Sequence, residues 1–276
     1  MYDFDNKRVY ITGGSSGIGL ETARQLALMG AHLILFSRDK VKLEYARKAV
    51  VQHRKHDLQK IQCIQLDVRD NAWVEQVMQQ AVKNFGAPDV LITNAGVGCA
   101  DYFENISFET FDAIMATNVY GTRNVIAALF SSMKQKGGRI VIIASIAGHM
   151  GMFGYTAYGT SKFALVGFSE CLRSELKRYG IRVSVVCPPE TDTPLIYEEG
   201  KTIPPEARAV KNLAGLLKPE YVAKRIIRGM QRNTYLIIPG FRATLLYFLQ
   251  CYLPGWIIQL SADLAVKRAE KNSDRE

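Results

Sequence analysis

Short apolar runs alternate with amphipathic segments through most of this chain. The amphipathic segments at residues 20–29, 41–56, 72–85 and 108–134 repeat apolar positions at helical spacing. The apolar runs between them lack the alternation of a half-exposed strand and are typical of parallel strands covered on both faces. These runs fall at residues 7–12, 32–36, 61–66, 89–93, 139–144, 181–187 and 236–238. The alternation predicts an α/β fold built on a doubly wound parallel sheet of about seven strands.

The pattern changes twice towards the carboxyl terminus. Residues 195–218 show little periodicity, and a long irregular segment inside a compact domain is usually a functional loop or lid. Residues 241–276 begin with an apolar stretch, broken by Pro254 and Gly255, and end in a charged tail. We therefore predict a single domain at residues 1–240, followed by an apolar extension at residues 241–276.

The extension is expected to begin with a helix that carries an apolar stripe and is apolar almost all round, since Leu246, Tyr247 and Cys251 lie off the stripe. The stripe consists of Leu245, Phe248, Leu249, Tyr252 and Leu253. No apolar piece reaches the ~20 residues that a membrane span requires. Three interpretations of residues 241–260 stay open: packing against the chain's own core or a second subunit, contact with a membrane surface, and lining of a tunnel for an acyl chain. Trp256 and Arg242 would be the anchors of a membrane contact.

Composition narrows the classes of partner. Of the 276 residues, 48% are hydrophobic and 22% are charged, which is ordinary for a globular protein. The net charge is +9, but Lys and Arg are dispersed without a block of like charges, so we expect no nucleic-acid partner. An anionic cofactor or a negatively charged membrane surface accounts better for the charge. His53 and His56 lack further ligands at suitable spacing, so no metal site is expected.

Cysteine usage and the amino-terminal sequence bear on location. The five cysteines are scattered, with no Cys-x-x-Cys pair and one left over from any pairing. They read as reduced core residues of a cytoplasmic protein. The first predicted strand begins near Lys7, so we expect no signal peptide or amino-terminal anchor. The extension would be the part that brings the protein to the cytoplasmic face of a membrane.

The first strand leads at once into a glycine loop, residues 13–19, and then into a helix. The loop contains Gly13, Ser15, Ser16, Gly17, Ile18 and Gly19. Glycines permit the tight turn and a close approach of the backbone, and the helix N-terminus offers free N–H groups to phosphate. A strand, a glycine turn and a helix in this order are the context of a dinucleotide-binding fingerprint.

The end of the second strand indicates which dinucleotide is bound. NAD sites usually carry an acid here for the ribose 2′-hydroxyl, whereas an arginine accommodates the 2′-phosphate of NADP. This chain has Ser37 and Arg38 at that place, and Lys42 follows on the next helix. Asp39 is assigned instead as the cap of that helix. The sequence therefore predicts NADPH as the cofactor, with Ser37, Arg38 and Lys42 in contact with it.

Two further strand ends supply cofactor-binding candidates. Asp67 and Val68 follow the third strand, where an acid either caps the helix starting near Asp70 or contacts the adenine. Asn94, Ala95 and Gly96 follow the fourth strand, and such small residues let a chain turn tightly beside a cofactor. We include all five residues of these two strand ends in the predicted cofactor site.

A tyrosine, a lysine and a serine form the candidate reaction centre. Tyr158 and Lys162 are four residues apart and share one face of a helix. A cation favours the phenolate and is expected to lower the tyrosine pKa, so that Tyr158 could exchange a proton with a substrate oxygen. Ser145 follows the fifth strand, at the edge of the sheet where α/β folds place their ligands.

Two places where regular structure is disfavoured also attract attention. Asn118 and Gly121 lie in the middle of the long helix predicted at 108–134, and such local inconsistencies cluster at functional sites. The prolines of the segment 188–194 break regular structure after the sixth strand, at the same edge of the sheet. We place Pro188 and Thr191 of that segment in the cofactor site.

In their order and spacing these residues resemble the short-chain dehydrogenase/reductase family. The resemblance rests on the glycine loop and on Asp67, Asn94-Ala-Gly96, Asn118, Ser145, Tyr158 and Lys162. It implies a Rossmann-type subunit in which Tyr158 is the proton donor and acceptor and Lys162 lowers the Tyr158 pKa and binds the nicotinamide ribose. Ser145 would hold the substrate oxygen, and Asn118 would support a water in a proton relay. Thr93 departs from the family pattern, where many members have Asn.

Within that family, one segment narrows the substrate. Pro188-Pro-Glu-Thr-Asp-Thr-Pro194 is similar to the corresponding segment of ketodihydrosphingosine (3-dehydrosphinganine) reductases, where most members have Pro-Gly. The resemblance implies NADPH-dependent reduction of a long-chain sphingoid ketone, and a homodimer or homotetramer. The alternatives are another lipid-type ketone or alcohol, such as a steroid, retinoid or 3-ketoacyl group, and a non-catalytic nucleotide sensor.

Overall fold

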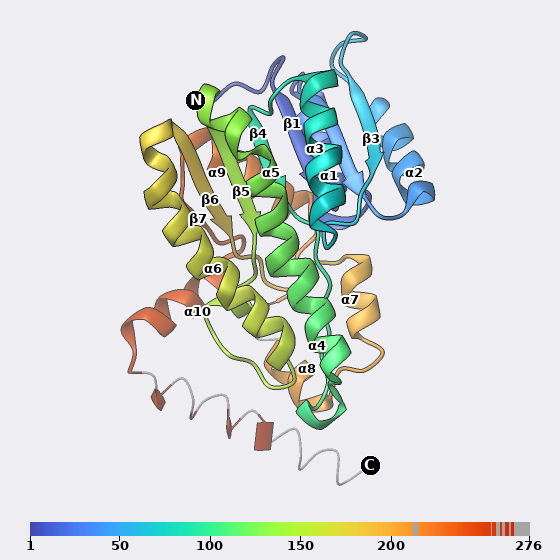
Figure 1. The fold of residues 1–276 in the computed structure, drawn as a ribbon. Helices are drawn as coiled ribbons and strands as arrows, with labels where there is room; N and C mark the ends of the chain where they lie inside the picture. Colours follow the sequence, from blue (N-terminus) through green and yellow to red (C-terminus); the bar gives the residue numbers. More distant parts are fainter. Residues whose placement is uncertain (212–214, 255, 258–259, 261–262, 265, 268–276) are drawn as a thin grey trace.

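A seven-stranded sheet runs through the centre of the molecule (Figure 1). The computed structural model describes residues 1–211, 215–254, 256–257, 260, 263–264 and 266–267. Neighbouring strands are parallel throughout, in the order β3-β2-β1-β4-β5-β6-β7. The strands are β1 (Arg8–Thr12), β2 (His32–Ser37), β3 (Ile61–Gln65), β4 (Val90–Thr93), β5 (Gly138–Ile143), β6 (Ile181–Val186) and β7 (Leu236–Ile237). The predicted Rossmann-type parallel sheet is confirmed, and the strand order reverses between β1 and β4.

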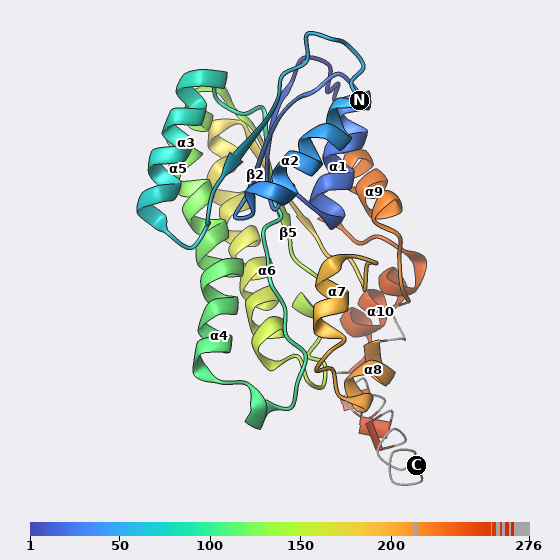
Figure 2. The same ribbon diagram turned by 90° about the vertical axis from the view of Figure 1, so that its right-hand side faces the viewer.

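Helices cover both faces of this sheet (Figure 2). One face carries α1 (Gly17–Leu28), α2 (Lys40–Val51) and α9 (Pro219–Arg232), and the other carries α3 (Asn71–Phe85), α5 (Gly121–Lys136) and α6 (Thr156–Leu176). Because helices cover both faces, the strands are buried on both sides, and successive side chains of a strand join opposite faces. In β1, Val9 and Ile11 join the apolar cluster under α1, α2 and α9, whereas Tyr10 joins the cluster under α3, α5 and α6.

The helix predicted at 108–134 is two helices joined by a wider turn. It consists of α4 (Phe108–Met115), a π-helical segment (Ala116–Tyr120) and α5. The Gly121 N–H therefore donates to the carbonyl of Ala116, five residues earlier. Gly121 also lets the helix approach the end of β3, because a Cβ there would lie 2.5 Å from Cγ2 of Val68. The local conflict predicted around Asn118 is thus a real interruption of the α-helix.

The segment predicted as an irregular lid contains two short helices. These are α7 (Pro194–Glu199) and α8 (Pro205–Lys211), and both lie beyond the carboxyl ends of the strands (Figures 1 and 2). Each begins at a proline, whose fixed φ suits a first helical position. Neither helix is long enough to repeat an apolar face, so periodicity could not reveal them. A bridge between Thr191 and Leu217 joins the two ends of the segment.

The helix α10 (Phe241–Tyr252) is attached along one side only. Ala243 is buried, and the Tyr247 ring packs against the core with its centroid 4.8 Å from that of His149. The predicted apolar stripe points away from the core, since all five of its residues are exposed, from 36% for Leu253 to 80% for Tyr252. Among the described residues, every helix is too short or too polar to cross a bilayer.

Candidate active site and cofactor site

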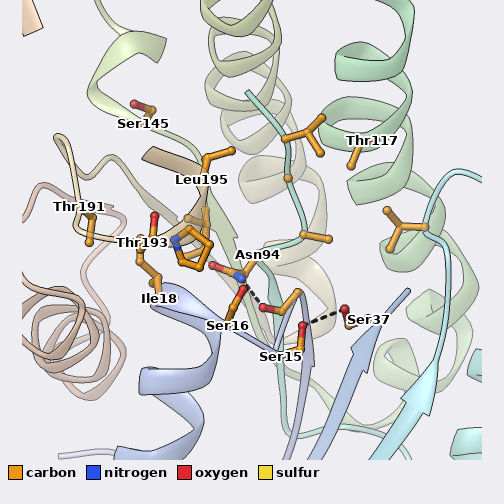
Figure 3. Close-up of a pocket in the computed structure, with 18 of the residues that line it drawn as sticks. Ser15, Ser16, Ile18, Ser37, Asn94, Thr117, Ser145, Thr191, Thr193 and Leu195 are labelled. Atoms are coloured by element: carbon orange, nitrogen blue, oxygen red, sulfur yellow. Dashed lines mark hydrogen bonds between the residues drawn. The ribbon is translucent and has the colours of Figure 1, made fainter. Parts of the chain in front are cut away.

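A cavity of about 300 Å³ opens at the carboxyl ends of the strands, where the strand order reverses (Figure 3). Open α/β sheets bind ligands at such switch points. Most of the predicted site residues line it: Gly13, Ser15, Ser16, Gly17, Ile18, Ser37, Arg38, Lys42, Val68, Asn94, Ala95, Gly96, Ser145, Tyr158, Lys162, Pro188 and Thr191. In the described part of the chain, Gly19, Asp67 and Asn118 do not belong to this lining.

The glycine loop is shaped to receive an anion. Gly13 and Gly17 have φ values of +63° and +52°, which L side chains rarely adopt. The Ser16 side chain caps no N–H group of α1 in the described structure, so the first turn keeps free donors for a ligand. Gly19 acts from behind the loop, because a Cβ there would collide with the Gly13 carbonyl and the Asn94 amide. These features fit the phosphates of a dinucleotide.

Asn94 fastens the glycine loop to the end of β4. Its side-chain amide donates to the Gly13 carbonyl at 2.9 Å. The backbone N–H groups of Asn94 and Ala95 donate to the Thr12 hydroxyl at 3.1 and 3.2 Å. Asn94 therefore shapes the cavity as well as lining it, and Thr12 is a support that sequence reasoning missed.

The end of β2 presents a cation to the cavity. Ser15 donates a hydrogen bond of 2.9 Å to Ser37, which ties the glycine loop to this strand (Figure 3). Asp39 accepts from the Lys42 backbone N–H at 3.0 Å, which confirms its role as a helix cap, and its carboxylate lies 3.9 Å from Lys42 Nζ. Arg38 lines the same end and forms no ion pair with any described residue. This guanidinium is therefore free to pair with a phosphate.

Asp67 does not act as the predicted helix cap. Asp70 caps α3 instead, by accepting from the Trp73 N–H at 3.0 Å, because it directly precedes the helix. The Asp67 carboxylate pairs with the Arg69 guanidinium at 2.6 Å. Its neighbour Val68 lines the cavity, so the adenine contact proposed for Asp67 stays a prediction.

Tyr158, Lys162 and Ser145 come together at the other end of the cavity. The spacing on α6 puts Lys162 Nζ 5.3 Å from the centre of the Tyr158 ring. Lys162 is buried, and its ammonium donates to the carbonyl of Ile143, the last residue of β5, at 3.1 Å. Ser145 Oγ accepts from the Ala147 N–H at 3.2 Å, which fixes its place two residues after β5. The structure thus brings these three predicted catalytic residues to one point.

Burial sets the pKa values in this group. It raises the pKa of the Tyr158 phenol above its usual value, and the nearby carboxylate of Glu199 raises that pKa further, while the Ser145 side chain opposes both. Burial also lowers the pKa of Lys162 to about 8. The pKa of Tyr158 is thus raised overall rather than lowered, and the effect predicted for Lys162 stays a prediction. A raised pKa keeps the Tyr158 hydroxyl protonated, which is the form that the predicted role of proton donor requires.

Asn118 lies in the π-helical segment and is fully buried. Its amide donates to the Val97 carbonyl at 3.0 Å and to the Ser161 hydroxyl at 2.9 Å, and its oxygen accepts from the Val97 N–H at 2.9 Å. The side chain therefore binds the strand-end loop after β4 to α6, next to Tyr158 and Lys162. The water-supporting role implied for Asn118 stays a prediction.

Sequence reasoning identified Pro188 and Thr191 after β6 but missed the other residues that this part of the chain adds to the site. Thr193, Pro194 and Leu195 line the cavity (Figure 3). Glu199, the last residue of α7, is buried and acts on the pKa of Tyr158. A single acid in an aperiodic segment carries no pattern that would have singled it out.

Comparisons with known proteins agree with this geometry. A family model described as short chain dehydrogenase matches residues 7–203. The chain is 38% identical over 245 residues to 3-ketodihydrosphingosine reductase of Bos taurus, covering 88% of this chain and 74% of that protein. It is 39% identical to 3-dehydrosphinganine reductase of Danio rerio with the same coverage. Ketoacyl reductase HetN of Nostoc sp. is 34% identical over 239 residues, covering 86% of this chain and 80% of that protein.

Solved structures give the same fold. The crystal structure of levodione reductase superimposes with a TM-score of 0.79 at 26% identity, covering 87% of this chain and 99% of that chain. A short chain dehydrogenase/reductase from Burkholderia phymatum, crystallised in complex with NAD, has a TM-score of 0.79 at 23% identity, over 90% of this chain and 94% of that chain. At that identity the second similarity concerns the fold alone.

Proposed function

Because this chain belongs to the short-chain dehydrogenase family, we propose that it is an NADPH-dependent reductase that converts 3-ketodihydrosphingosine to dihydrosphingosine. The observation that carries the proposal is the 38% identity to 3-ketodihydrosphingosine reductase over 88% of the chain. The segment from Pro188 to Pro194 supports it, because its prolines and threonines line the same cavity as Tyr158 and Ser145.

The geometry suggests how the residues divide the work. Enzymes of this family use NAD or NADP, which supplies the hydride when bound. Ser145 and Tyr158 direct hydroxyl groups at the place where negative charge develops on the ketone oxygen, and Tyr158 then gives up its proton. Lys162, held by the Ile143 carbonyl, keeps a positive charge beside the Tyr158 ring as that proton leaves.

The proposed preference for NADPH is based on the residues at the end of β2. Ser37 is uncharged, and Arg38 forms no ion pair within the described residues. An arginine at this position can bind the 2′-phosphate that distinguishes NADP from NAD.

The test is the oxidation of NADPH by the purified protein with 3-ketodihydrosphingosine in detergent micelles. A short-chain β-keto ester and a ketosteroid serve as controls. Turnover of the sphingoid ketone well above both controls would support the proposal. Turnover only with a control substrate would reject the sphingoid substrate and leave the reductase chemistry in place.

A 3-ketoacyl group is the second candidate substrate. The 34% identity to the ketoacyl reductase of Nostoc favours it over a steroid or a retinoid. Activity with the β-keto ester alone, in the assay above, would point to this class.

We also propose that the exposed stripe of α10 rests on a lipid surface. A long-chain sphingoid base dissolves in membranes, and α10 lies beyond the carboxyl ends of the strands, at the same end of the molecule as α7 and α8 (Figures 1 and 2). Phe248 and Tyr252 are 48% and 80% exposed on this helix, and Arg242 is exposed at its start. Aromatic and basic residues on a helix with an apolar face are typical of an interfacial contact.

The substitution Phe248→Glu tests this contact. We expect it to weaken cosedimentation with phosphatidylcholine–phosphatidylserine vesicles by about tenfold or more, since it puts a charge where an aromatic ring would be buried in lipid. Phe108→Glu, on the 78% exposed side chain at the start of α4, is the matched control and should bind like the wild type. Unchanged binding by Phe248→Glu, or a dimer that this variant dissociates, would assign the stripe to another use or to a subunit interface.

A further inference from the structure

A carboxylate is buried directly beside the predicted catalytic tyrosine. Glu199 is only 3% exposed. A Cβ placed on Gly98 would collide with Glu199 Oε1 and would lie 3.3 Å from Cδ2 of Tyr158, so the carboxylate and the phenol ring face each other across this glycine. Glu199 also raises the pKa values of Tyr158 and Lys162, although burial is the main influence on both groups. The Glu199 carboxylate therefore lies next to Tyr158 and also influences the charges of Tyr158 and Lys162.

The Glu199 carboxylate shares the Lys211 ammonium with the carboxylate of Glu190. Glu199 Oε2 accepts from Lys211 Nζ and from the Tyr155 hydroxyl, each at 3.2 Å. The same Nζ lies 3.0 Å from Glu190 Oε1, and the Lys211 side chain is only 11% exposed. One buried lysine thus faces two carboxylates. Lys162 is the next cation that acts on Glu199, but its ammonium is bonded to the Ile143 carbonyl.

The second oxygen of Glu199 has no hydrogen-bond donor among the described residues. All hydrogen bonds to this carboxylate from described residues go to Oε2, and Oε1 is the atom that faces Gly98 and Tyr158. Burying a carboxylate without a full complement of donors is unfavourable, and burial indeed raises the pKa of Glu199 despite Lys211. A cationic group that reached Oε1 would remove this cost.

We propose that Glu199 binds the ammonium group of an α-amino ketone substrate and thereby selects that substrate class. The proposal rests on the reductase function proposed above, since 3-ketodihydrosphingosine carries an amine on the carbon next to its ketone. A ketone oxygen at the Tyr158 hydroxyl places that amine beside the Tyr158 ring, where Oε1 lies. A charge-assisted hydrogen bond there would fix which face of the ketone is presented.

The distinctive segment 188–194 holds Glu199 in this position. Glu190 of that segment binds Lys211, and its carbonyl accepts from the Leu217 N–H at 2.9 Å. Asp192 accepts from the hydroxyl of Tyr197, on α7, at 2.9 Å. Asp192 thus contacts α7, which ends at Glu199, and Glu190 contacts Lys211 at the end of α8. Through these contacts the two acids would influence specificity without touching the substrate.

Binding of two ligands that differ only in the amine tests the proposal. The ligands are 2-aminodecane-1,3-diol and decane-1,3-diol, titrated calorimetrically into protein saturated with NADP. We expect Glu199→Gln to weaken binding of the aminodiol about 10- to 100-fold, which is the size of one hydrogen bond to a charged group, and to leave the diol unchanged. Glu206→Gln is the matched control, because Glu206 is also buried and accepts from a tyrosine, Tyr102, at 3.1 Å.

A second variant separates binding from damage to the fold. Glu199→Asp keeps the negative charge on a side chain one methylene shorter, so we expect it to weaken binding of the aminodiol less than Glu199→Gln does and to leave the diol unchanged. A loss of both ligands in both variants, or an equal loss in Glu206→Gln, would overturn the proposal. Amine binding that depends on Glu199 in a protein that does not turn over sphingoid ketones would instead reject the proposed function and keep the amine site.

Discussion

Replacing Tyr158 with Phe is expected to abolish ketone reduction while leaving the fold intact. The substitution removes only the hydroxyl of a residue that lines the cavity with Ser145, and the hydrogen bond from Lys162 to the Ile143 carbonyl remains. A positioned general acid contributes about 10²- to 10⁴-fold to a rate, so kcat should fall within that range. The binding of NADPH should weaken by less than about tenfold, the most that a single neutral hydrogen bond supplies. Steady-state NADPH oxidation and fluorescence titration measure the two effects.

Tyr45→Phe is the matched control for this experiment. Tyr45 lies on α2, is 69% exposed and is absent from the cavity lining, so its hydroxyl should be dispensable. Reduction that persists at the wild-type rate in Tyr158→Phe would mean that another group protonates the substrate oxygen, and the assigned role of Tyr158 would be wrong.

Replacing Arg38 with Ala is expected to weaken the proposed preference for NADPH. If this guanidinium binds the 2′-phosphate, its loss should raise the KM for NADPH about 10- to 100-fold, the size of a charge-assisted hydrogen bond. The KM for NADH should change little, because NADH has a hydroxyl in place of that phosphate. The measurement is a pair of saturation curves with each cofactor at fixed substrate.

Lys40→Ala controls for the loss of a positive charge near the cavity. Lys40 is an exposed cation two residues along on α2 and does not line the cavity. If Arg38→Ala raised both KM values equally, the 2′-phosphate would be recognised elsewhere, with Lys42 as the next cation in the lining.

The sheet and the glycine loop were predictable because each has a strong local signal. Runs such as residues 139–144 are apolar without alternation, which only a strand covered on both faces requires. Gly13 and Gly17 stand where positive φ is needed, and the order of strand, loop and helix could be read from the chain. Tyr158 and Lys162 were predictable from helical spacing, and Ser145 from its place after a strand.

The features that escaped prediction depend on contacts distant in sequence. The pKa of Tyr158 is raised by burial and by Glu199, which lies 41 positions after the tyrosine in the sequence. The helices α7 and α8 are too short to show a period, and their place is set by Glu190 and Lys211. Of the two interpretations left open for Asp67, the structure excludes the helix cap, because Asp70 caps α3 and Arg69 pairs with the Asp67 carboxylate. The adenine contact stays a prediction.

The π-helical segment between α4 and α5 fixes the rotational phase of one helix against the other. Each residue turns an α-helix by about 100°. The π-helical turn at Ala116–Tyr120 contains one residue more than an α-helical turn, so α4 is rotated about its axis by about that angle relative to a continuous α-helix with α5. This rotation turns Ile114 of α4 into the protein while α5 buries Val125 and Leu129. Deleting one residue here would restore a regular helix, but it would rotate the buried face of α4 out of alignment with the buried face of α5. The length of this stretch, rather than any single side chain, is therefore what keeps Asn118 in line with α6.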